Sequence, residues 1–472
     1  MLFNRKSRDW HEFRKDVQGI GEKVLLANNQ KGVYINLDNA ASTPALRPVV
    51  QEMEDFLNWY SGVHRGMGYK SLLSSQLYEE AHTIVGRFLN ADPDQNTVIF
   101  LKNTTEAINK LSYRFNFVPG DMVLTTEMEH HSNDLPWRGR ARVKYAAVDE
   151  RGVLDVNDVE KQLKLNYPRV KLLAVTGASN VTGHINDVHY LAGLAHEHKA
   201  MIMVDGAQLA PHMQLDLKAA HHPQHIDFVA FSGHKIYAPY GTGVLVGPRE
   251  FFLKGDPEYV GGGTVDMVTG AQVYWTRLPD REEAGSPNVV GAVALARTLQ
   301  YLGKLGMENL AAYESVLCAH GLKQLKTVPG ITVYGATPRV GVISFNLAGF
   351  NPTQLGTILC HEGGIAVRTG CFCAQPYIRK LLGERDNVKL LPFYKNKDPD
   401  NLPGMVRISL GAYNTEGEID AVVNLLKKIA SDRRYYQVNY RYSPDTRSYL
   451  PAAAQKKMWQ EIQAHCRTFL EI

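Results

Sequence analysis

The chain has 472 residues, of which 44% are hydrophobic and 21% are charged, with a formal net charge of +4. This composition is typical of a folded globular protein of two or three domains and excludes the low-hydrophobicity, high-charge pattern of intrinsic disorder. The small net charge gives no support for binding to nucleic acid. No run of about 18 apolar residues is present and the first ten residues lack an apolar signal core, so we expect a cytoplasmic protein without a membrane partner.

In the first 250 residues, short apolar segments alternate with longer segments of helical pattern. The six predicted strands are residues 97–101, 122–126, 171–176, 200–205, 228–231 and 243–246. Residues 187–198 are a predicted helix between two of them, and residues 71–89 are a predicted helix before the first. This alternation predicts an α/β fold with a largely parallel sheet.

The second half of the chain is predicted to form a different unit. Residues 255–287 are expected to be irregular, and a helix at 290–305 leads on from them. The elements predicted after this link are a helix at 311–325, a strand at 342–347, a helix at 352–361 and a strand at 364–368. The basic and aromatic stretch 433–449 could stack nucleic-acid bases, but we expect a packed tail. From residue 451 we expect an amphipathic helix that packs on the body and makes Cys466 structural.

Polar residues directly follow five of the predicted strands. These clusters are Asn103-Thr104-Thr105-Glu106, Glu129-His130-His131-Ser132-Asn133, Ser179-Asn180, Asp205-Gly206-Ala207-Gln208 and Ser232-Gly233-His234-Lys235. Taken singly, each has a simpler explanation as a helix cap or a surface charge. Ligands bind beyond the carboxyl ends of parallel strands, so together the clusters predict a site at one sheet edge.

Pyridoxal phosphate is a cofactor that needs this set of side chains. It requires a lysine for a Schiff base and a carboxylate beside its ring nitrogen, which Lys235 and Asp205 would supply. His130 would stack on the ring, and Asn180 and Gln208 would lie near its phenolic oxygen. The phosphate needs hydroxyls and a helix N-terminus. The candidates for the phosphate are Thr104, Thr105, Ser232 and His234.

Several motifs, together with these clusters, resemble class V aminotransferase-like enzymes of fold type I, and most closely the SufS-type cysteine desulfurases. The further matching motifs are Asp38-Asn39-Ala40-Ala41-Ser42-Thr43-Pro44, Val63-His64-Arg65-Gly66, Ala284-Gly285-Ser286-Pro287-Asn288, Arg368-Thr369-Gly370-Cys371-Phe372-Cys373 and Arg407-Ile408-Ser409-Leu410. The resemblance covers residues 34–428. It implies a mostly parallel seven-stranded sheet in a large domain (30–305), a smaller α+β domain (1–29 and 306–432) and a homodimer. Residues 433–472 would be a C-terminal extension.

The resemblance assigns roles residue by residue. Gly261 and Ser286 would reach the phosphate of the neighbouring subunit's cofactor, although related enzymes often have Thr in place of Ser286. Arg407, with Arg368 and Asn180, would bind the substrate. Cys373 would be the nucleophile that takes sulfur from L-cysteine as a persulfide while L-alanine leaves.

The attacking sulfur must be a thiolate, and Arg368 and His130 are candidate cations beside Cys373. A metal pair at Cys371 and Cys373 has no second pair of ligands, so we expect no metal there. A buried inert thiol at Cys373 is the other alternative, and Cys371 is either an accessory thiol or a bystander. The five cysteines, Cys318, Cys360, Cys371, Cys373 and Cys466, are an odd, sparse set, which indicates a reducing compartment.

One departure from the family concerns the 34 positions between Cys373 and Arg407, a longer segment than SufS-type enzymes have. Its extra residues, 384–404, are either a lid or docking surface or a solvated insertion. They leave the sulfur acceptor protein open. The Gly-Cys-Phe-Cys order also resembles the desulfurase domain of molybdenum cofactor sulfurases, which carry a further C-terminal domain. His221, His222 and His225 are expected in a solvated loop rather than a metal site.

Three functions remain open on the sequence. The first is a cysteine desulfurase, with selenocysteine lyase activity as a variant that uses the same residues. The second is a C–S β-lyase, which would release pyruvate and ammonia and would not need Cys373. The third is a sulfur-relay or scaffold protein that binds the cofactor without catalysis, against which Lys235, Asp205 and Arg407 argue.

Overall fold

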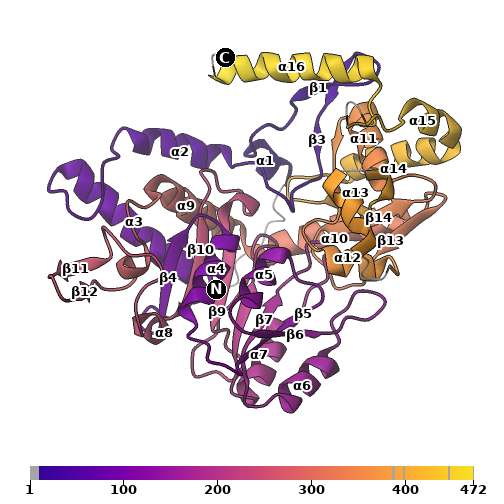
Figure 1. Ribbon diagram of the computed structural model, residues 1–472. Helices are drawn as coiled ribbons and strands as arrows, with labels where there is room; N and C mark the ends of the chain where they lie inside the picture. Colours follow the sequence, from indigo (N-terminus) through magenta and orange to yellow (C-terminus); the bar gives the residue numbers. More distant parts are fainter. Residues whose placement is uncertain (1–9, 385–387, 397–398, 445–446, 471–472) are drawn as a thin grey trace, which may run out of the picture.

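The computed structural model describes residues 10–384, 388–396, 399–444 and 447–470 (Figure 1). Its larger part is built on a seven-stranded sheet in the order β4-β10-β9-β8-β7-β5-β6. The strands are β4 (Asn96–Leu101), β5 (Met122–Thr126), β6 (Arg142–Ala146), β7 (Val170–Thr176), β8 (Met201–Asp205), β9 (Phe228–Ser232) and β10 (Gly243–Pro248). All run parallel except β10, which pairs antiparallel with both β4 and β9. The mostly parallel seven-stranded sheet is therefore confirmed.

Helices cover both faces of this sheet. Successive side chains of a strand point to opposite faces, so an apolar strand makes both faces apolar and each must be buried. In β7, Leu173 and Val175 join one apolar core, while Leu172 and Ala174 join a second core on the other face. The helices that pack on the first face are α2 (Arg47–Leu57), α3 (Tyr69–Phe88), α6 (Val156–Leu165), α7 (Val188–Glu197) and α9 (Val289–Leu305). The helices on the second face are α4 (Thr104–Arg114), α5 (Leu135–Arg138) and α8 (Arg249–Leu253).

The segment expected to be irregular contains an exposed hairpin. Strands β11 (Val265–Val268) and β12 (Val273–Trp275) pair antiparallel and project from the large domain (Figure 1). Most of their side chains are exposed. An exposed hairpin does not need the alternation of apolar and polar residues that reveals a buried one, and so nothing in the sequence indicated these strands. A 3₁₀ turn at Asp280–Glu282 follows before α9 begins.

The smaller domain has a four-stranded antiparallel sheet in the order β13-β14-β17-β16. Its elements are α10 (Met307–Leu325), β13 (Ile331–Tyr334), β14 (Val342–Leu347), α11 (Pro352–Gly363), β16 (Arg368–Gly370), β17 (Met405–Ser409) and α14 (Glu416–Ser431). The strand predicted at 364–368 is wrong as a single element. The chain instead forms β15 (Ile365–Ala366), which pairs with β3 (Ile35–Asn36), and then β16, which pairs with β17.

The N-terminal residues contribute to both domains. In α1 (Trp10–Lys15) and just after it, Phe13 and Val17 belong to the large apolar core, whereas Leu37 belongs to the core of the smaller domain. Strands β1 (Lys23–Leu25) and β2 (Lys31–Val33) form a separate hairpin between these two attachments. The domain boundaries at residues 30, 305 and 432 stay a prediction.

The C-terminal extension divides into a packed part and an exposed part. In and after α15 (Arg433–Asn439), Tyr436 and Tyr440 are buried against the small domain, as expected of a packed tail. The helix α16 (Ala452–Leu470) contacts the β1–β2 hairpin through Lys457 to Asn29 and Lys31 to Glu461 (Figure 1).

The expectation that this helix packs on the body holds in part, since Met458 packs against the small-domain core, but it is wrong for the C-terminal part of the helix and for Cys466. Trp459, Phe469 and Leu470 are exposed, and Cys466 is exposed rather than structural. An amphipathic pattern shows that one face is apolar, but it does not show what covers that face.

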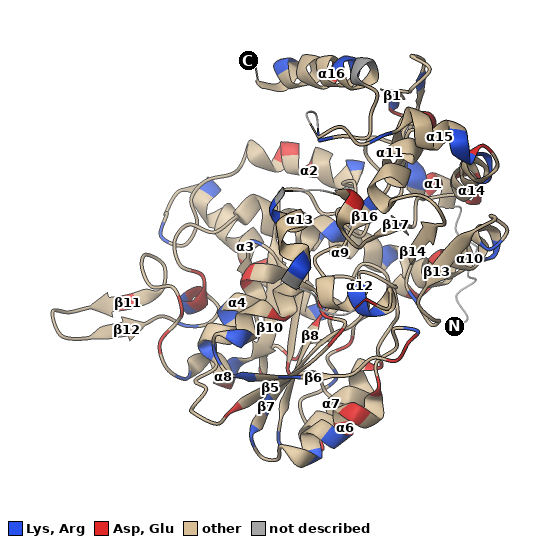
Figure 2. Cartoon of the chain, turned by 45° about the vertical axis from the view of Figure 1, so that its right-hand side comes forward, with Lys and Arg blue, Asp and Glu red and all other residues tan. Residues whose placement is uncertain are grey.

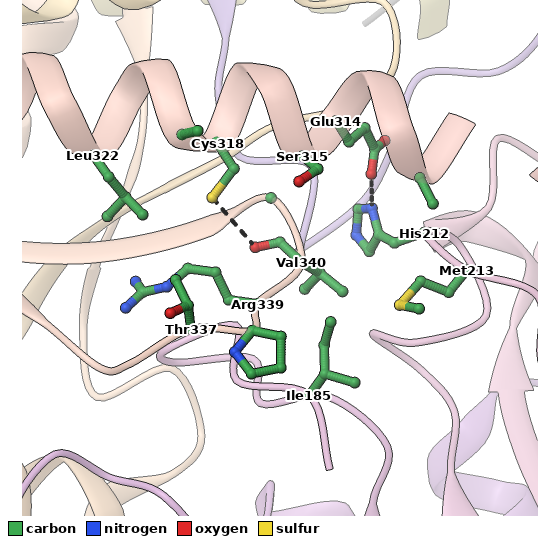
Figure 3. Close-up of a pocket in the computed structure, with 14 residues that line it drawn as sticks. Ile185, His212, Met213, Glu314, Ser315, Cys318, Leu322, Thr337, Arg339 and Val340 are labelled. Carbon is green, nitrogen blue, oxygen red and sulfur yellow. Dashed lines mark hydrogen bonds and ion pairs between the residues drawn. The ribbon is translucent and has the colours of Figure 1, made fainter. Parts of the chain in front are cut away.

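A cavity of about 280 Å³ lies where the two domains meet, as Figure 3 shows. The large domain contributes Ile185, His212 and Met213, and α10 contributes Glu314 and Cys318. His212 Nδ1 lies 2.6 Å from Glu314 Oε2, and both side chains are buried. This ion pair ties α10 to the large domain.

Charged residues of both signs are spread over both domains, as Figure 2 shows. Within the part of the chain that the structure describes, no helix is both long and apolar enough to cross a membrane.

Candidate active site

A cavity of about 150 Å³ opens at the carboxyl ends of the parallel strands. Nine residues predicted to bind the cofactor line it: Thr104, Thr105, His130, Asn180, Asp205, Gln208, Ser232, His234 and Lys235. They come from the segments that follow β4, β5, β7, β8 and β9. The parallel register aligns these strand ends, and so residues up to 131 positions apart meet in one place. Gly261 and Ser286 do not line this cavity and are exposed.

Hydroxyl groups gather at one end of the cavity, at the N-terminus of α4. The Thr104 backbone N–H donates to Ser232 Oγ at 2.8 Å, and the two hydroxyl oxygens lie 2.6 Å apart. Thr105 Oγ1 lies 2.7 Å from Ser132 Oγ. Hydroxyls together with a helix N-terminus form a site for a phosphate group.

A carboxylate and an amine face the same cavity. Asp205 ends β8, and its Oδ1 accepts a hydrogen bond from the Ala207 backbone N–H at 2.9 Å. Burial raises the pKa of Asp205, and the neighbouring Lys235 works against this rise. Burial also lowers the pKa of Lys235, which favours the neutral amine that can act as a nucleophile.

His130 is held as a neutral ring. Its Nδ1 accepts a hydrogen bond from the Ser132 backbone N–H at 3.1 Å, which requires an unprotonated Nδ1. Burial lowers the pKa of His130 to about 3, and the positive charges of Lys235, His131 and Arg407 act in the same direction. The expectation that His130 serves as a cation beside Cys373 is therefore not met, whereas a neutral ring suits stacking.

Glu129 holds this strand end in place, a role that the sequence analysis missed. Its carboxylate accepts hydrogen bonds from Thr126 Oγ1 at 2.6 Å, Asn133 Nδ2 at 2.7 Å and the Thr176 backbone N–H at 3.0 Å. Burial raises the pKa of Glu129 to about 8 although these donors favour its charged form. The carboxylate ties the end of β5 to the end of β7, and this fixes the position of His130.

The Cys373 segment lies against the cavity wall and is held by two hydrogen bonds. Asn180 Nδ2 donates to the Phe372 carbonyl at 2.7 Å, and the His131 backbone N–H donates to the Cys373 carbonyl at 2.7 Å. Phe372 and Cys373 adopt φ angles of 48° and 55°. These lie in the left-handed region of backbone conformation, which residues other than glycine rarely adopt. Cys373 is exposed, so the prediction of a buried inert thiol is wrong.

Arg407 lies on β17, buried beside the cavity. Its guanidinium donates to the Asn180 carbonyl at 2.9 Å and to Asp38 Oδ1 at 3.1 Å. Its Nε is buried and has no hydrogen-bond partner among the residues that the structure describes. Burial lowers the pKa of Arg407 to about 10, and Asp38 opposes this. Asp38 also pairs with the exposed Arg368 at 2.7 Å, so one carboxylate orients both predicted substrate arginines. The sequence motif contained Asp38 but gave no signal of this role.

A second cavity, of about 390 Å³, lies on the other side of the Cys373 segment. The long insertion supplies part of its wall through Tyr394 on α13 (Leu391–Asn396) and Leu402 and Pro403 after the 3₁₀ turn Pro399–Asn401. Residues 385–387, 397 and 398 of the predicted lid lie outside the described residues. The described part of the insertion lines this cavity and is mostly exposed or half-buried, so both a docking surface and a solvated insertion stay open.

The two cysteines of this segment face different surroundings. The Cys371 thiol is half-buried and donates to the Pro403 carbonyl at 3.2 Å. Burial also raises the pKa of Cys371, which disfavours its thiolate. Cys373 is exposed and lines the second cavity, so its thiol is the more accessible nucleophile of the pair.

The residues around the first cavity fit pyridoxal phosphate. The hydroxyls at the α4 N-terminus suit its phosphate, Asp205 suits its ring nitrogen, and Lys235 suits its aldehyde. Among the residues that the structure describes, the buried Arg407 Nε has no acceptor, and this leaves a donor for a substrate beside that cofactor.

The chain is similar to proteins of known family. Residues 35–422 match the family model described as aminotransferase class-V. A probable cysteine desulfurase from Halalkalibacterium halodurans is 34% identical over 427 residues, which cover 89% of this chain and 97% of that protein. A cysteine desulfurase from Escherichia coli is 36% identical over 406 residues, covering 83% of this chain and 92% of the relative.

Solved structures agree with these sequence matches. The apo structure of the cysteine desulfurase from Thermococcus onnurineus has a TM-score of 0.76 at 32% identity and covers 90% of this chain and 99% of that one. The cysteine desulfurase CsdA from Escherichia coli has a TM-score of 0.75 at 29% identity, covering 90% of this chain and 98% of its own. The fold type I architecture and the cofactor expected from the sequence are thereby confirmed. With its sheet, its cavity and these matches in agreement, the chain belongs to the class-V aminotransferase family of pyridoxal phosphate-dependent enzymes.

Proposed function

We propose that this protein is a cysteine desulfurase, which converts L-cysteine to L-alanine and keeps the removed sulfur as a persulfide on Cys373. The observation that carries the proposal is the exposed Cys373 thiol, in a segment that is bonded to Asn180 of the cofactor cavity. Hydrogen bonds from Asn180 and His131 hold its backbone there. A C–S β-lyase has no use for such a thiol.

Nine residues would hold the cofactor. Lys235 would bind it covalently through its amine, Asp205 would keep its ring nitrogen protonated, and His130 would stack on the ring. Asn180 and Gln208 would lie at its phenolic oxygen. Thr104, Thr105, Ser232 and His234 would hold the phosphate. When bound, pyridoxal phosphate draws electrons from the substrate α-carbon and so leaves the substrate sulfur open to attack.

The two arginines would bind and orient the substrate. The buried Arg407 presents a planar guanidinium that can grip a carboxylate through two parallel hydrogen bonds. Asp38 sets its orientation and also that of Arg368, which lies at the solvent side. The freed Lys235 amine is then positioned to move a proton at the substrate α-carbon.

Cys373 would accept the sulfur as a thiolate. The thiolate is the form of a cysteine that acts as a nucleophile. The attack forms one S–S bond and breaks the substrate C–S bond, so the Cys373 persulfide and alanine account for all atoms. Cys371 would be a bystander, because its thiol is engaged with Pro403.

The assembly we propose is a homodimer. Large apolar side chains are exposed after α2 and along β11–β12, among them Trp59, Met67, Tyr259 and Met267. The exposed Gly261 and Ser286 are absent from the cavity of their own chain, which agrees with a role at the partner's phosphate. The persulfide would pass to an acceptor protein near the second cavity. All five cysteines are free, which supports a reducing cytoplasm.

The decisive experiment follows the carbon product of L-cysteine in the presence of a reductant. We expect alanine and sulfide in equal amounts from the wild type, no turnover from Cys373→Ala, and near-normal turnover from the matched control Cys371→Ala. Pyruvate and ammonia, formed equally well by Cys373→Ala, would overturn the proposal in favour of a β-lyase. Running selenocysteine in parallel measures the preference between the two substrates.

A further inference from the structure

At the opposite end of the central sheet, two histidines converge on one carboxylate. His196 lies near the end of α7, and His225 and Asp227 lie just before β9. His196 Nε2 is 2.9 Å from Asp227 Oδ2, and His225 Nε2 is 3.3 Å from Asp227 Oδ1. The nitrogen and oxygen atoms of the three residues all lie within 4.8 Å of one another. The sequence predicted only a solvated loop here, because His196 is 29 positions away from His225.

The other nitrogen of each ring is committed to the backbone. His196 Nδ1 lies 2.8 Å from the Pro223 carbonyl, and His225 Nδ1 lies 2.7 Å from the His222 carbonyl. A carbonyl only accepts hydrogen bonds, so both Nδ1 atoms carry a proton. In a neutral ring, Nε2 is then an unprotonated acceptor. Each of these acceptors faces a carboxylate oxygen, which is an acceptor as well.

Such facing acceptors need either protons or a cation between them. Protonation is one answer for His225, because the hydrogen bond to Asp227 raises its pKa. Protons on both rings would make two imidazolium ions, yet the rings stack with centroids 4.2 Å apart and planes only 26° apart. Two like charges repel at that separation, and Asp227 offsets one of them. One divalent cation satisfies both neutral Nε2 atoms and the carboxylate at once.

We propose that His196, His225 and Asp227 form a binding site for a zinc-type divalent cation. Neighbouring ligand atoms around tetrahedral zinc, with bonds of about 2.0–2.1 Å, lie roughly 3.3 Å apart, close to the spacing found here. Imidazole and carboxylate are ligands that zinc accepts, and an Nδ1–H bonded to a carbonyl is how proteins orient a metal-binding histidine. Side-chain exposures of 20% and 23% for the histidines leave room for a water ligand.

The site would act as a structural clamp. The cation would join the end of α7 to the loop before β9, in addition to the hydrogen bond from the Ile202 backbone N–H to Asp227. Ser232 of the cofactor cavity lies five positions after Asp227, at the far end of β9, a distance on the order of 16 Å. Metal binding here is therefore independent of the cofactor chemistry and does not rest on the proposed function.

The test measures zinc binding to the chelator-stripped protein that still carries its cofactor, with a chromophoric chelator as competitor. The variants are His196→Asn and His225→Asn, since the asparagine amide can still donate to the carbonyl that Nδ1 serves. His221→Asn is the matched control, an exposed histidine of the same loop. We expect one zinc per chain for the wild type and control, and affinity at least about tenfold weaker in both variants.

A second readout replaces zinc by Co²⁺ in the wild type and needs no variant to fold. A visible spectrum of nitrogen and oxygen ligands, without a thiolate charge-transfer band, supports the site. A thiolate band, which would place the metal at Cys371 or Cys373, overturns it. Zinc affinity that is the same in His196→Asn, His225→Asn and the wild type also overturns it.

Discussion

Replacing Asn180 by alanine tests whether the Cys373 segment is held in place by the residue that also borders the cofactor cavity. The substitution removes the 2.7 Å hydrogen bond from Asn180 Nδ2 to the Phe372 carbonyl and leaves that carbonyl without its donor. An unsatisfied buried group costs about 1–3 kcal/mol. At RT of about 0.59 kcal/mol, this lowers the population of the held segment roughly 5- to 160-fold.

The assay is single-turnover formation of the Cys373 persulfide, followed beside the change in cofactor absorbance on substrate binding. We expect persulfide formation to slow by about that factor, because the left-handed backbone at Phe372 and Cys373 loses a restraint. Gln375→Ala, in the same segment, is the control and should change the rate little. An unchanged persulfide rate in Asn180→Ala would refute the reasoning, since it would show that this hydrogen bond does not position Cys373.

Three further predictions concern charge. The folded pKa of His130 is about 3, so its ring should stay neutral from pH 5 to 8 and its NMR signals should not titrate there. In the unfolded chain this histidine binds a proton at a higher pH, so the free energy of unfolding should fall as the pH drops from about 6.5 towards 3. The fall should be smaller in His130→Gln. Arg407→Lys cannot contact both the Asn180 carbonyl and Asp38, so kcat/KM for L-cysteine should fall about 10- to 150-fold, against a smaller loss for the exposed Arg368→Lys. The Glu282 carboxylate is shared by two buried cations, Lys110 at 3.2 Å and Arg114 at 3.1 Å. Glu282→Gln removes its charge and should lower the free energy of unfolding, measured by denaturant titration, by about 3–5 kcal/mol. The control Glu12→Gln, at an exposed ion pair, should leave it unchanged.

The first cavity could be predicted because its residues follow a rule of sheet geometry. Each of its polar clusters comes directly after an apolar strand, and parallel strands bring their carboxyl ends to one edge. Lys235 and Asp205 were found this way. The antiparallel β10 leaves no trace in the pattern, because a buried strand reads the same in either direction.

The positions of Asp38 and Glu129 could not be predicted in the same way. Asp38 and Arg407 are 369 positions apart in the sequence. They come together because Asp38 forms a β-bridge with Ser409, the last residue of β17. Glu129 was visible as a polar residue, but its three donors come from two strands and a turn. Such contacts depend on tertiary packing, which leaves no local signal in the sequence. The same holds for His196, which the fold brings from α7 to the loop before β9.

The two cavities beside Cys373 explain how one thiol could serve two reactions. The narrow cavity of about 150 Å³ is lined by the cofactor residues, whereas the wider one of about 390 Å³ is lined by the insertion and opens on the other side of the same segment. His130 borders the first cavity and its neighbour His131 borders the second. Under the proposed function, a local movement of this segment would let Cys373 receive sulfur on one side and present it on the other. The insertion that departs from the family pattern lines this second cavity, so under the same proposal it would contact the acceptor without altering the residues that hold the cofactor.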